Sequence, residues 1–283
     1  MKMAVIGCGL IGGSMALSWK RAGIVDEVIA FGHNPATLQK ALDKGAADTV
    51  TTSMEEAVKD ADIVVSAVPV EAMESVFTEM APFLKSDAVV TDVGSTRQTV
   101  IAAARKGLGD KFHQYAPAHP IAGGEMPGVD YASADLFDEK VVISTPDEGM
   151  DPKVVTFIEE AWRKAGARVQ AMSPLQHDLT FASVSHLPHV LAYALVDMIA
   201  REENAQEKLK MAGAGFRDFT RIASSSPVMW RDICLSNREA LSHELERYRA
   251  SLDTLQKYID ESDGKALESV FENAVRNLSL IHI

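Results

Sequence analysis

Length, charge and composition exclude several classes of protein before any motif is considered. The chain has 283 residues, with 28 Lys and Arg against 40 Asp and Glu, and its formal net charge is −12 with histidine neutral. Apolar residues make up 47% and charged residues 24%, which is typical of a folded globular chain and excludes a disordered one. The acidic balance argues against a nucleic-acid binder or a binder of anionic membranes. Two cysteines, Cys8 and Cys234, exclude a disulfide framework and a cysteine-rich metal site.

The N-terminus shows no pattern of a targeting sequence. The apolar run at residues 1–6 is short and meets Gly7, whereas a secretory signal needs a longer apolar region and a cleavage site of small residues. No stretch approaches ~18 uninterrupted apolar residues, the length that crosses a membrane. We therefore expect a cytoplasmic protein that does not span a membrane.

Short β-branched runs alternate with helical patterns through residue 172. Strands are predicted at residues 3–6, 28–31, 62–68, 88–91, 113–118, 141–144 and 167–171. Helices are predicted at residues 10–22, 36–44, 96–106 and 152–165. A short helix is predicted to open at Ser53, and another helix, after the strand at residues 62–68, is predicted to end at about residue 83. This alternation predicts an α/β domain at residues 1–172, with a doubly wound, mostly parallel sheet of the Rossmann type.

No convincing strand follows Met172, so residues 173–283 are predicted to form a separate all-α domain. Residues 175–185 and 188–201 have helical patterns. A seam of apolar residues spaced 4, 3, 4, 3 and 4 apart then follows, at Leu241, Leu245, Tyr248, Leu252, Leu255 and Ile259. Such a seam packs within its own bundle or against a partner, and dimerisation through this domain is our hypothesis.

The first chemical motif is G-x-G-x-x-G, which follows a strand and opens a helix. Gly7 permits the tight turn, Gly9 lets the backbone approach a pyrophosphate, and Gly12 allows close packing of helix against strand. The N–H groups of the first helical residues, Leu10 and Ile11, then face the anion. The alternative is a glycine turn that binds no nucleotide.

The end of the second strand predicts which dinucleotide is accepted. An Asp or Glu at this place would bind the ribose 2′-hydroxyl of NAD, but the sequence offers Gly32, His33 and Asn34. Without the acid there is no repulsion toward a 2′-phosphate, and His33 and Asn34 could donate hydrogen bonds to one. We therefore expect NAD or NADP, with NADP at least tolerated. The alternative is that His33 is simply a solvated loop residue.

Polar residues also follow later strands of the predicted sheet, where ligands of open α/β sheets bind. Ser95 follows one strand, and His119 lies at the end of the next, among glycines and before a proline. Core packing explains such a histidine poorly, whereas a base near neutral pH suits it. Ser95 is predicted to orient His119 or to contact the nicotinamide.

The helical half carries polar residues that a plain bundle would not need. His186 and His189 flank a proline, and a glycine-rich segment at residues 213–221 contains arginines suited to carboxylates. Metal binding by His177, His186 and His189 is the weaker alternative, because no acidic or cysteine pattern accompanies them, and no metal is expected. Trp230 is a core aromatic or a wall of the site.

Together these segments resemble the prephenate/arogenate (cyclohexadienyl) dehydrogenases of tyrosine biosynthesis. The matching segments, spread over almost the whole chain, are GCGLIGGS, DVGS, HPIAGGE, SHLPH and GFRDFTRIASSSPVMWRD. The resemblance implies a Rossmann domain followed by an all-helical dimerisation domain. It also implies oxidation of the ring C4 hydroxyl of prephenate or arogenate with decarboxylation, giving 4-hydroxyphenylpyruvate or tyrosine.

The resemblance further implies roles for individual residues. His119 would take the hydroxyl proton, with Ser95 supporting it and the cofactor, and His189 and Arg221 would contact substrate carboxylates.

Other roles implied by the resemblance concern the rim of the site. Glu125 and Asp218 would belong to an ionic group that controls access, and Trp230 would close the partner subunit's site. Ala214 stands where similar enzymes often have Gly, and a contact through its backbone N–H would survive that change.

Two other functions stay open from the residues alone. A β-hydroxyacid type of dehydrogenase would be expected to offer a catalytic lysine on its helical domain, and the motifs above contain none. A non-catalytic nucleotide sensor would need residues 7–12 but has no use for His119, His189 and Arg221 together.

Overall fold

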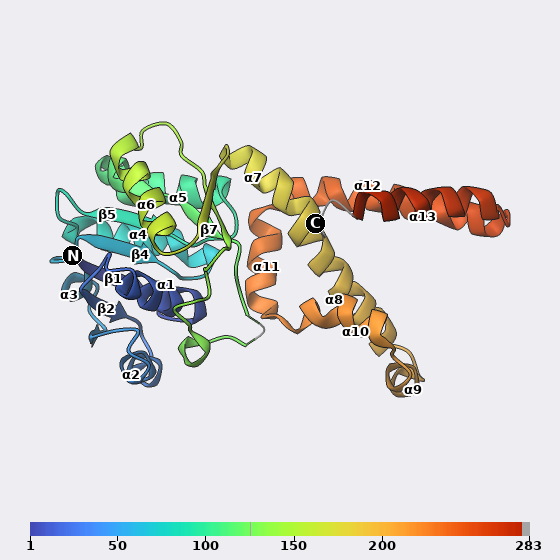
Figure 1. Ribbon diagram of the computed structural model, residues 1–283, viewed down its shortest axis with the longest axis horizontal. Coiled ribbons are helices and arrows are strands. Elements are labelled where there is room, and N and C mark those ends of the chain that lie inside the picture. The colour runs from blue at the N-terminus through green and yellow to red at the C-terminus, as the bar shows by residue number, and fades with distance from the viewer. Residues whose placement is uncertain (125, 279–283) are drawn as a thin grey trace. The chain divides into compact units, whose positions relative to one another are not determined.

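The computed structural model describes residues 1–124 and 126–278 (Figure 1). The described residues divide after Arg238 into two compact units. The first unit contains every strand of the described residues, the last of which ends at Ala171. The domain boundary expected between residues 172 and 173 thus falls where strands give way to helices, and as a domain division it stays a prediction.

A six-stranded parallel sheet forms the centre of the first unit, in the order β3-β2-β1-β4-β5-β6. Its strands are β1 (Lys2–Ile6), β2 (Glu27–Phe31), β3 (Thr49–Thr51), β4 (Ile63–Ser66), β5 (Val89–Asp92) and β6 (Tyr115–Ala116). The chain adds β2 and β3 on one side of β1 and then β4, β5 and β6 on the other side, so the strand order reverses between β1 and β4. In such sheets, ligands bind outside the carboxyl ends of the strands beside this point. The predicted fold class is confirmed.

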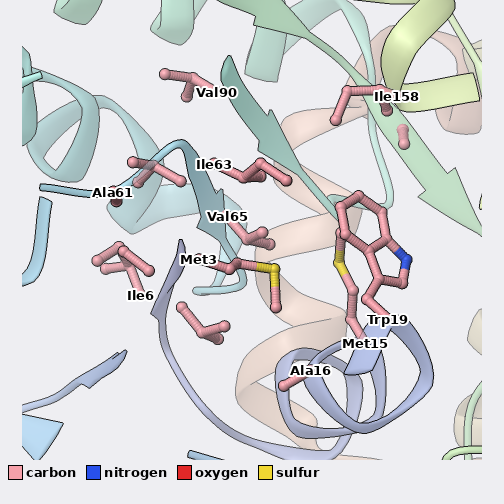
Figure 2. Close-up of a cluster of buried hydrophobic side chains, with 14 of the residues drawn as sticks. Met3, Ile6, Met15, Ala16, Trp19, Ala61, Ile63, Val65, Val90 and Ile158 are labelled. Atoms are coloured by element: carbon pink, nitrogen blue, oxygen red, sulfur yellow. The ribbon is translucent and has the colours of Figure 1, made fainter. Parts of the chain in front are cut away.

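Helices in this part of the chain connect the parallel strands and cover the sheet. They are α1 (Leu10–Arg21), α2 (Pro35–Asp43), α3 (Met54–Val58), α4 (Met73–Met80), α5 (Gln98–Leu108) and α6 (Pro152–Lys164). β4 is buried at all four positions, as expected of a strand covered on both faces. Figure 2 shows Met15 and Trp19 of α1 beside Met3 and Val65 of β1 and β4 in this core.

A second sheet of three strands holds the segment that contains His119. Its strands are β7 (Ala118–Pro120), β8 (Val141–Ser144) and β9 (Arg168–Ala171), with β7 antiparallel and β9 parallel to β8. The prediction of one strand at residues 113–118 was wrong, because the chain leaves β6 at Ala116 and enters the other sheet at Ala118. Pro117 stands between them, and a residue without an N–H cannot continue the first ladder. His119 therefore lies within a strand, opposite Ile143, rather than after one.

After β9, the regular elements of the first unit are all helical. They are α7 (Pro174–Phe181), a π-helical turn (Ala182–His186), α8 (Leu187–Ala200), α9 (Ala205–Lys210), α10 (Ala214–Thr220), a 3₁₀ turn (Arg221–Ser224) and α11 (Pro227–Ser236). Pro188 lies inside the continuous run from α7 to α8, where its missing N–H would break an α-helical hydrogen bond. The wider π turn directly before it accommodates this loss.

The helical run Pro174–Ala200 is long and apolar enough to cross a membrane by length and composition, although only 28% of its most apolar window is buried within the chain. The run also carries the buried polar residues His177, Asp178 and His186, each hydrogen-bonded to another side chain.

The second unit contains α12 (Arg238–Asp260) and α13 (Gly264–Leu278). The predicted apolar seam at residues 241–259 lies entirely on α12. Leu252 and Ile259 of this seam are exposed, as are Phe271 and Val275 of α13.

A buried ion pair holds the carboxyl end of β5 to the chain that carries His119. Arg97 donates to the Asp92 carboxylate at 2.7 Å and to the Ala118 carbonyl at 3.1 Å. The Tyr115 hydroxyl donates to the same carboxylate at 2.6 Å. Arg97, Asp92 and Tyr115 are all 0% exposed, so no water can replace a lost partner.

Arg97→Met should therefore lower the free energy of unfolding by about 3–5 kcal/mol, because it leaves the Asp92 carboxylate buried without its cation. Arg163 pairs with Glu159 at the surface, half exposed, and serves as the matched control. Arg163→Met should change the free energy of unfolding by at most about 0.5 kcal/mol. Urea unfolding measures both, and equal losses in the two variants would contradict the assignment.

Candidate active site

The glycine loop after β1 leaves an open approach to the start of α1. Gly7 has a φ of +92°, and a Cβ there would lie 2.7 Å from the Ala67 carbonyl oxygen. A Cβ on Gly12 would lie 2.5 Å from the Gly7 carbonyl oxygen. A Cβ on Gly9, by contrast, would meet nothing within 4 Å. The outer two glycines are needed for packing, and the middle one leaves space for a ligand.

The first turn of α1 fits the pyrophosphate of a dinucleotide. No side chain caps this helix, and no acidic residue lies in its first turn. The N–H groups of a first turn have no carbonyl partner within the helix, and they carry the positive end of its dipole. Leu10 and Ile11 begin this turn. An anion beside Gly9 would meet these groups, which is the arrangement that binds phosphates.

The segment after β2 contains no carboxylate at residues 32–34. His33 packs edge-on against Phe31, with ring centroids 5.2 Å apart, and is exposed. Asn34 caps α2 by accepting hydrogen bonds from the N–H groups of Ala36 and Thr37. The Asn34 amide nitrogen keeps its donors, so the predicted hydrogen bonds to a cofactor remain chemically available. Gly32 precedes these two residues.

Ser95 lies just beyond β5, in a turn shaped by the buried ion pair. The Gly94 N–H donates to the Asp92 carboxylate at 2.7 Å, and this bond fixes the backbone directly before Ser95. Within the part of the chain that the structure describes, no hydrogen bond joins Ser95 to His119. The predicted support of His119 by Ser95 stays a prediction.

His119 is bonded to a second histidine. Its Nδ1 atom lies 2.8 Å from Nε2 of His177, and its ring also contacts Phe181, with centroids 5.1 Å apart. Burial lowers the pKa of His119 well below its ordinary value, and the charges of His177, Arg97 and His186 lower it further. His119 is therefore neutral at neutral pH, which is the form that can accept a proton.

His177 and Asp178 are the site residues that sequence reasoning missed. The sequence suggests His177 only as a metal ligand and does not single out Asp178. The one available signal is that a histidine and an acid stand side by side in a helix of otherwise apolar character, and the sequence does not show that this helix packs beside β7.

His189 and Trp230 form a stacked pair in a second cluster. Their rings are 3.7 Å apart and 19° from parallel, and His189 donates from Nδ1 to the Ser185 carbonyl. Burial lowers the pKa of His189, the Ser185 carbonyl acts to raise it, and the charge of Arg221 lowers it further. Arg221 therefore lies within electrostatic reach of His189. The contribution of Trp230 to a partner's site stays a prediction.

Two of the residues predicted for the rim of the site, Ala214 and Asp218, lie on α10. Ala214 begins α10 and Asp218 lies in its middle, and both are exposed. α10 and the turn that begins at Arg221 pack against α8, which carries His189. Glu125 lies outside the described residues, so its predicted role is not addressed by the structure. The predicted site residues that the structure describes thus lie in three groups, at the glycine loop, around His119 and around His189. The charge of His186 lowers the pKa of His119, and the charge of His189 lowers the pKa of His186.

Comparisons with known proteins agree with this arrangement. Residues 15–171 match the family model for the nucleotide-binding domain of prephenate dehydrogenase, and residues 173–273 match the model for its dimerization domain. The chain belongs to the prephenate dehydrogenase family. The cyclohexadienyl dehydrogenase of Zymomonas mobilis is 36% identical over 274 residues, which cover 96% of this chain and 93% of that protein.

Solved structures of this family share the fold. The prephenate dehydrogenase of Aquifex aeolicus, in complex with hydroxyphenyl propionate and NAD⁺, superimposes with a TM-score of 0.91 at 35% identity and covers 99% of this chain and 98% of its own. The arogenate dehydrogenase of Synechocystis gives a TM-score of 0.81 at 27% identity, over 98% and 99% of the two chains. The predicted membership of this family is confirmed.

The buried His186 makes stability depend on pH. Burial lowers its pKa to about 4, while an unfolded histidine titrates near 6.5. Between pH 6.5 and about pH 4, His186 binds a proton in the unfolded chain but not in the folded chain. The free energy of unfolding therefore falls as the pH drops toward 4. His186 alone should contribute about 3 kcal/mol of this loss.

His186→Asn removes the titrating ring and leaves an oxygen that can accept from Asn237, the present partner of His186. The loss of unfolding free energy between pH 6.5 and pH 4 should then be smaller than in the wild type by about 3 kcal/mol. Urea unfolding across this range measures the difference, and parallel curves would rule the assignment out.

Proposed function

We propose that this protein catalyses the oxidative decarboxylation of prephenate or arogenate with NAD or NADP as hydride acceptor. The observation that carries this proposal is the half-buried His119, whose Nδ1 lies 2.8 Å from Nε2 of His177, so that its other ring nitrogen serves as the base. Membership of the prephenate dehydrogenase family supports it. The dinucleotide, when bound, would supply the site that accepts a hydride from ring C4.

His119 takes the proton of the C4 hydroxyl. Loss of that proton and of the hydride leaves a carbonyl at C4, and aromatisation of the ring then drives the loss of carbon dioxide. Burial serves this step, because a desolvated imidazole stays neutral and free to accept until substrate is bound. Ser95 is proposed to orient the cofactor or His119.

His189 and Arg221 bind the carboxylates of the substrate. Nδ1 of His189 donates its proton to the Ser185 carbonyl, so Nε2 is the ring nitrogen left to bind a ligand. A substrate carboxylate favours the imidazolium form of His189, whose Nε2–H donates to it, and Arg221 adds a guanidinium. Asp218 and Glu125 are proposed to control access at the rim, Ala214 to offer its N–H, and Trp230 to form a wall of the site.

The helical domain, proposed to begin at residue 173, forms a homodimer. Exposed apolar side chains lie along the run from α7 to α8, among them Leu175, Leu179 and Val184. The second unit exposes further apolar side chains on α12 and α13. Exposed apolar side chains grouped in this way are typical of an interface between proteins. In addition, residues 173–273 match the family model of a dimerization domain. A cytoplasmic location is part of the same proposal.

The experiment that tests the function is an assay of prephenate and of arogenate, each with NAD and with NADP. We expect turnover of at least one substrate, and turnover with NADP because no acid stands at Gly32 to repel its 2′-phosphate. Absence of turnover with all four pairs would overturn the proposal.

His119→Asn should lower kcat by roughly 10²–10⁴-fold, the range for loss of a positioned base, with little change in cofactor affinity. Arg221→Ala is the companion variant and should mainly raise KM, because it removes binding to a carboxylate rather than to the reacting hydroxyl. Steady-state kinetics with the preferred substrate separate the two. An unchanged kcat for His119→Asn would remove His119 from its role.

The dimer predicts a solution mass of twice the 30.6 kDa chain. Light scattering at micromolar concentration measures it directly. Val184→Glu and Leu179→Glu place a charge on the exposed apolar face of α7 and the π turn, and should shift the mass toward one chain. A wild-type mass equal to one chain would exclude this interface.

A further inference from the structure

The buried residue His177 connects His119, the base of the proposed reaction, to the negatively charged Asp178. His119, His177 and Asp178, hereafter the relay, are joined by hydrogen bonds of 2.8 Å and 2.9 Å. His177 is 0% exposed and Asp178 is 1% exposed, so water does not compete for these bonds. The relay joins β7 to α7.

The carboxylate of Asp178 is held ionised. It accepts the backbone N–H of Arg97 at 2.7 Å and that of Gln98 at 2.9 Å, at the start of α5. Burial acts to raise the pKa of Asp178, but the hydrogen bonds from His177 and from these two N–H groups outweigh it and lower the pKa. An ionised carboxylate only accepts hydrogen bonds.

Proton positions then follow along the relay. Because Asp178 only accepts, the Nδ1 atom of His177 carries the proton of that bond. A neutral His177 is left with Nε2 as an acceptor, so the Nδ1 atom of His119 must donate to it. Nε2 of His119 is left with an unshared electron pair, which is what a base requires.

We propose that His177 is a positioning residue, oriented by Asp178, which holds His119 in its Nδ1–H form and stabilises the imidazolium produced when the base accepts a proton. The inference rests on the proposed function for the identity of the proton donor, the substrate hydroxyl. In the step itself the O–H bond breaks and a bond from hydrogen to Nε2 of His119 forms. The Nδ1–H bond to His177 stays in place and strengthens once its donor is charged.

The other charged groups around His119 make this support necessary. Burial acts against a positive charge on His119, and so do the charges of His177, Arg97 and His186. Asp178 supplies a negative charge from the far end of the relay. His177 separates this carboxylate from the base, so His119 gains stabilisation of its cation without a direct ion pair, which would hold it protonated at rest.

Two substitutions of His177 separate positioning from packing. In His177→Asn the shorter amide reaches the place of Nδ1 and can still donate to Asp178, but nothing accepts from His119. In His177→Gln the longer amide reaches the place of Nε2, and its oxygen can accept the Nδ1–H of His119. Both remove the ring from the contact with Phe181, so their losses of packing are comparable.

His177→Asn should lower kcat by about 10- to 100-fold with KM nearly unchanged, the range expected when a reacting group loses its orientation. His177→Gln should recover most of that loss. His113→Asn, at an exposed histidine bonded to the Asp110 carbonyl, is the control and should leave kcat unchanged. Equal kcat values for the Asn and Gln variants of His177, or a wild-type kcat in His177→Asn, would overturn the proposal.

A measurement without substrate tests the relay independently of the proposed function. Nitrogen-15 NMR of the wild-type protein at neutral pH should show the ring proton of both His119 and His177 on Nδ1. In His177→Asn the signals of His119 should shift toward a mixture of the two tautomers. A wild-type His119 protonated on Nε2 would overturn the relay whatever substrate the enzyme uses. The NMR result expected here, with no turnover of prephenate or arogenate, would reject only the function.

Discussion

The carboxylate of Asp178 is the point on which the arrangement of the site depends. It accepts two backbone N–H groups at the start of α5, directly after the turn that carries Ser95, and it also fixes His177. One buried charge thereby ties the helical run that begins at Pro174 to the sheet. Nearby, the hydroxyl groups of Thr96, just before α5, and of Ser236, at the end of α11, lie 2.7 Å apart and join these two segments. The helices that follow the last strand are thus attached beside His119, the proposed base.

Features set by local sequence were predictable. The glycine loop at residues 7–12 combines a strand, a tight turn and a helix within a few residues, and each step follows from the backbone freedom of glycine or from burial. The short helix at residues 54–58 begins as expected, with the Ser53 hydroxyl accepting from the N–H of Glu56. His119 was found as a candidate base because a histidine beside a proline and glycines suits no core position.

Features set by contacts between distant segments were not predictable in the same way. The change of sheet at Pro117 depends on which strand lies beside Ala118, and His177 contacts His119 across 58 residues of sequence. The stacking of Trp230 on His189 likewise joins two separate helices, and the sequence left Trp230 as either core or wall. Periodicity assigns residues to helices, but it does not say which helix faces which strand.

The π turn at residues 182–186 has a geometric consequence for the helix that contains it. In a regular α-helix, positions 177 and 189 would differ by twelve steps of about 100°, which sets them about 120° apart around the axis. One extra residue in a wide turn takes up about one such step, and the two histidines then differ by only about 20°. If the same residues were wound as a regular α-helix throughout, His189 would instead point about 120° away from the direction of His177. The irregular turn thus lets one helical run present His177 of the relay and His189, the proposed carboxylate-binding residue, in nearly the same direction.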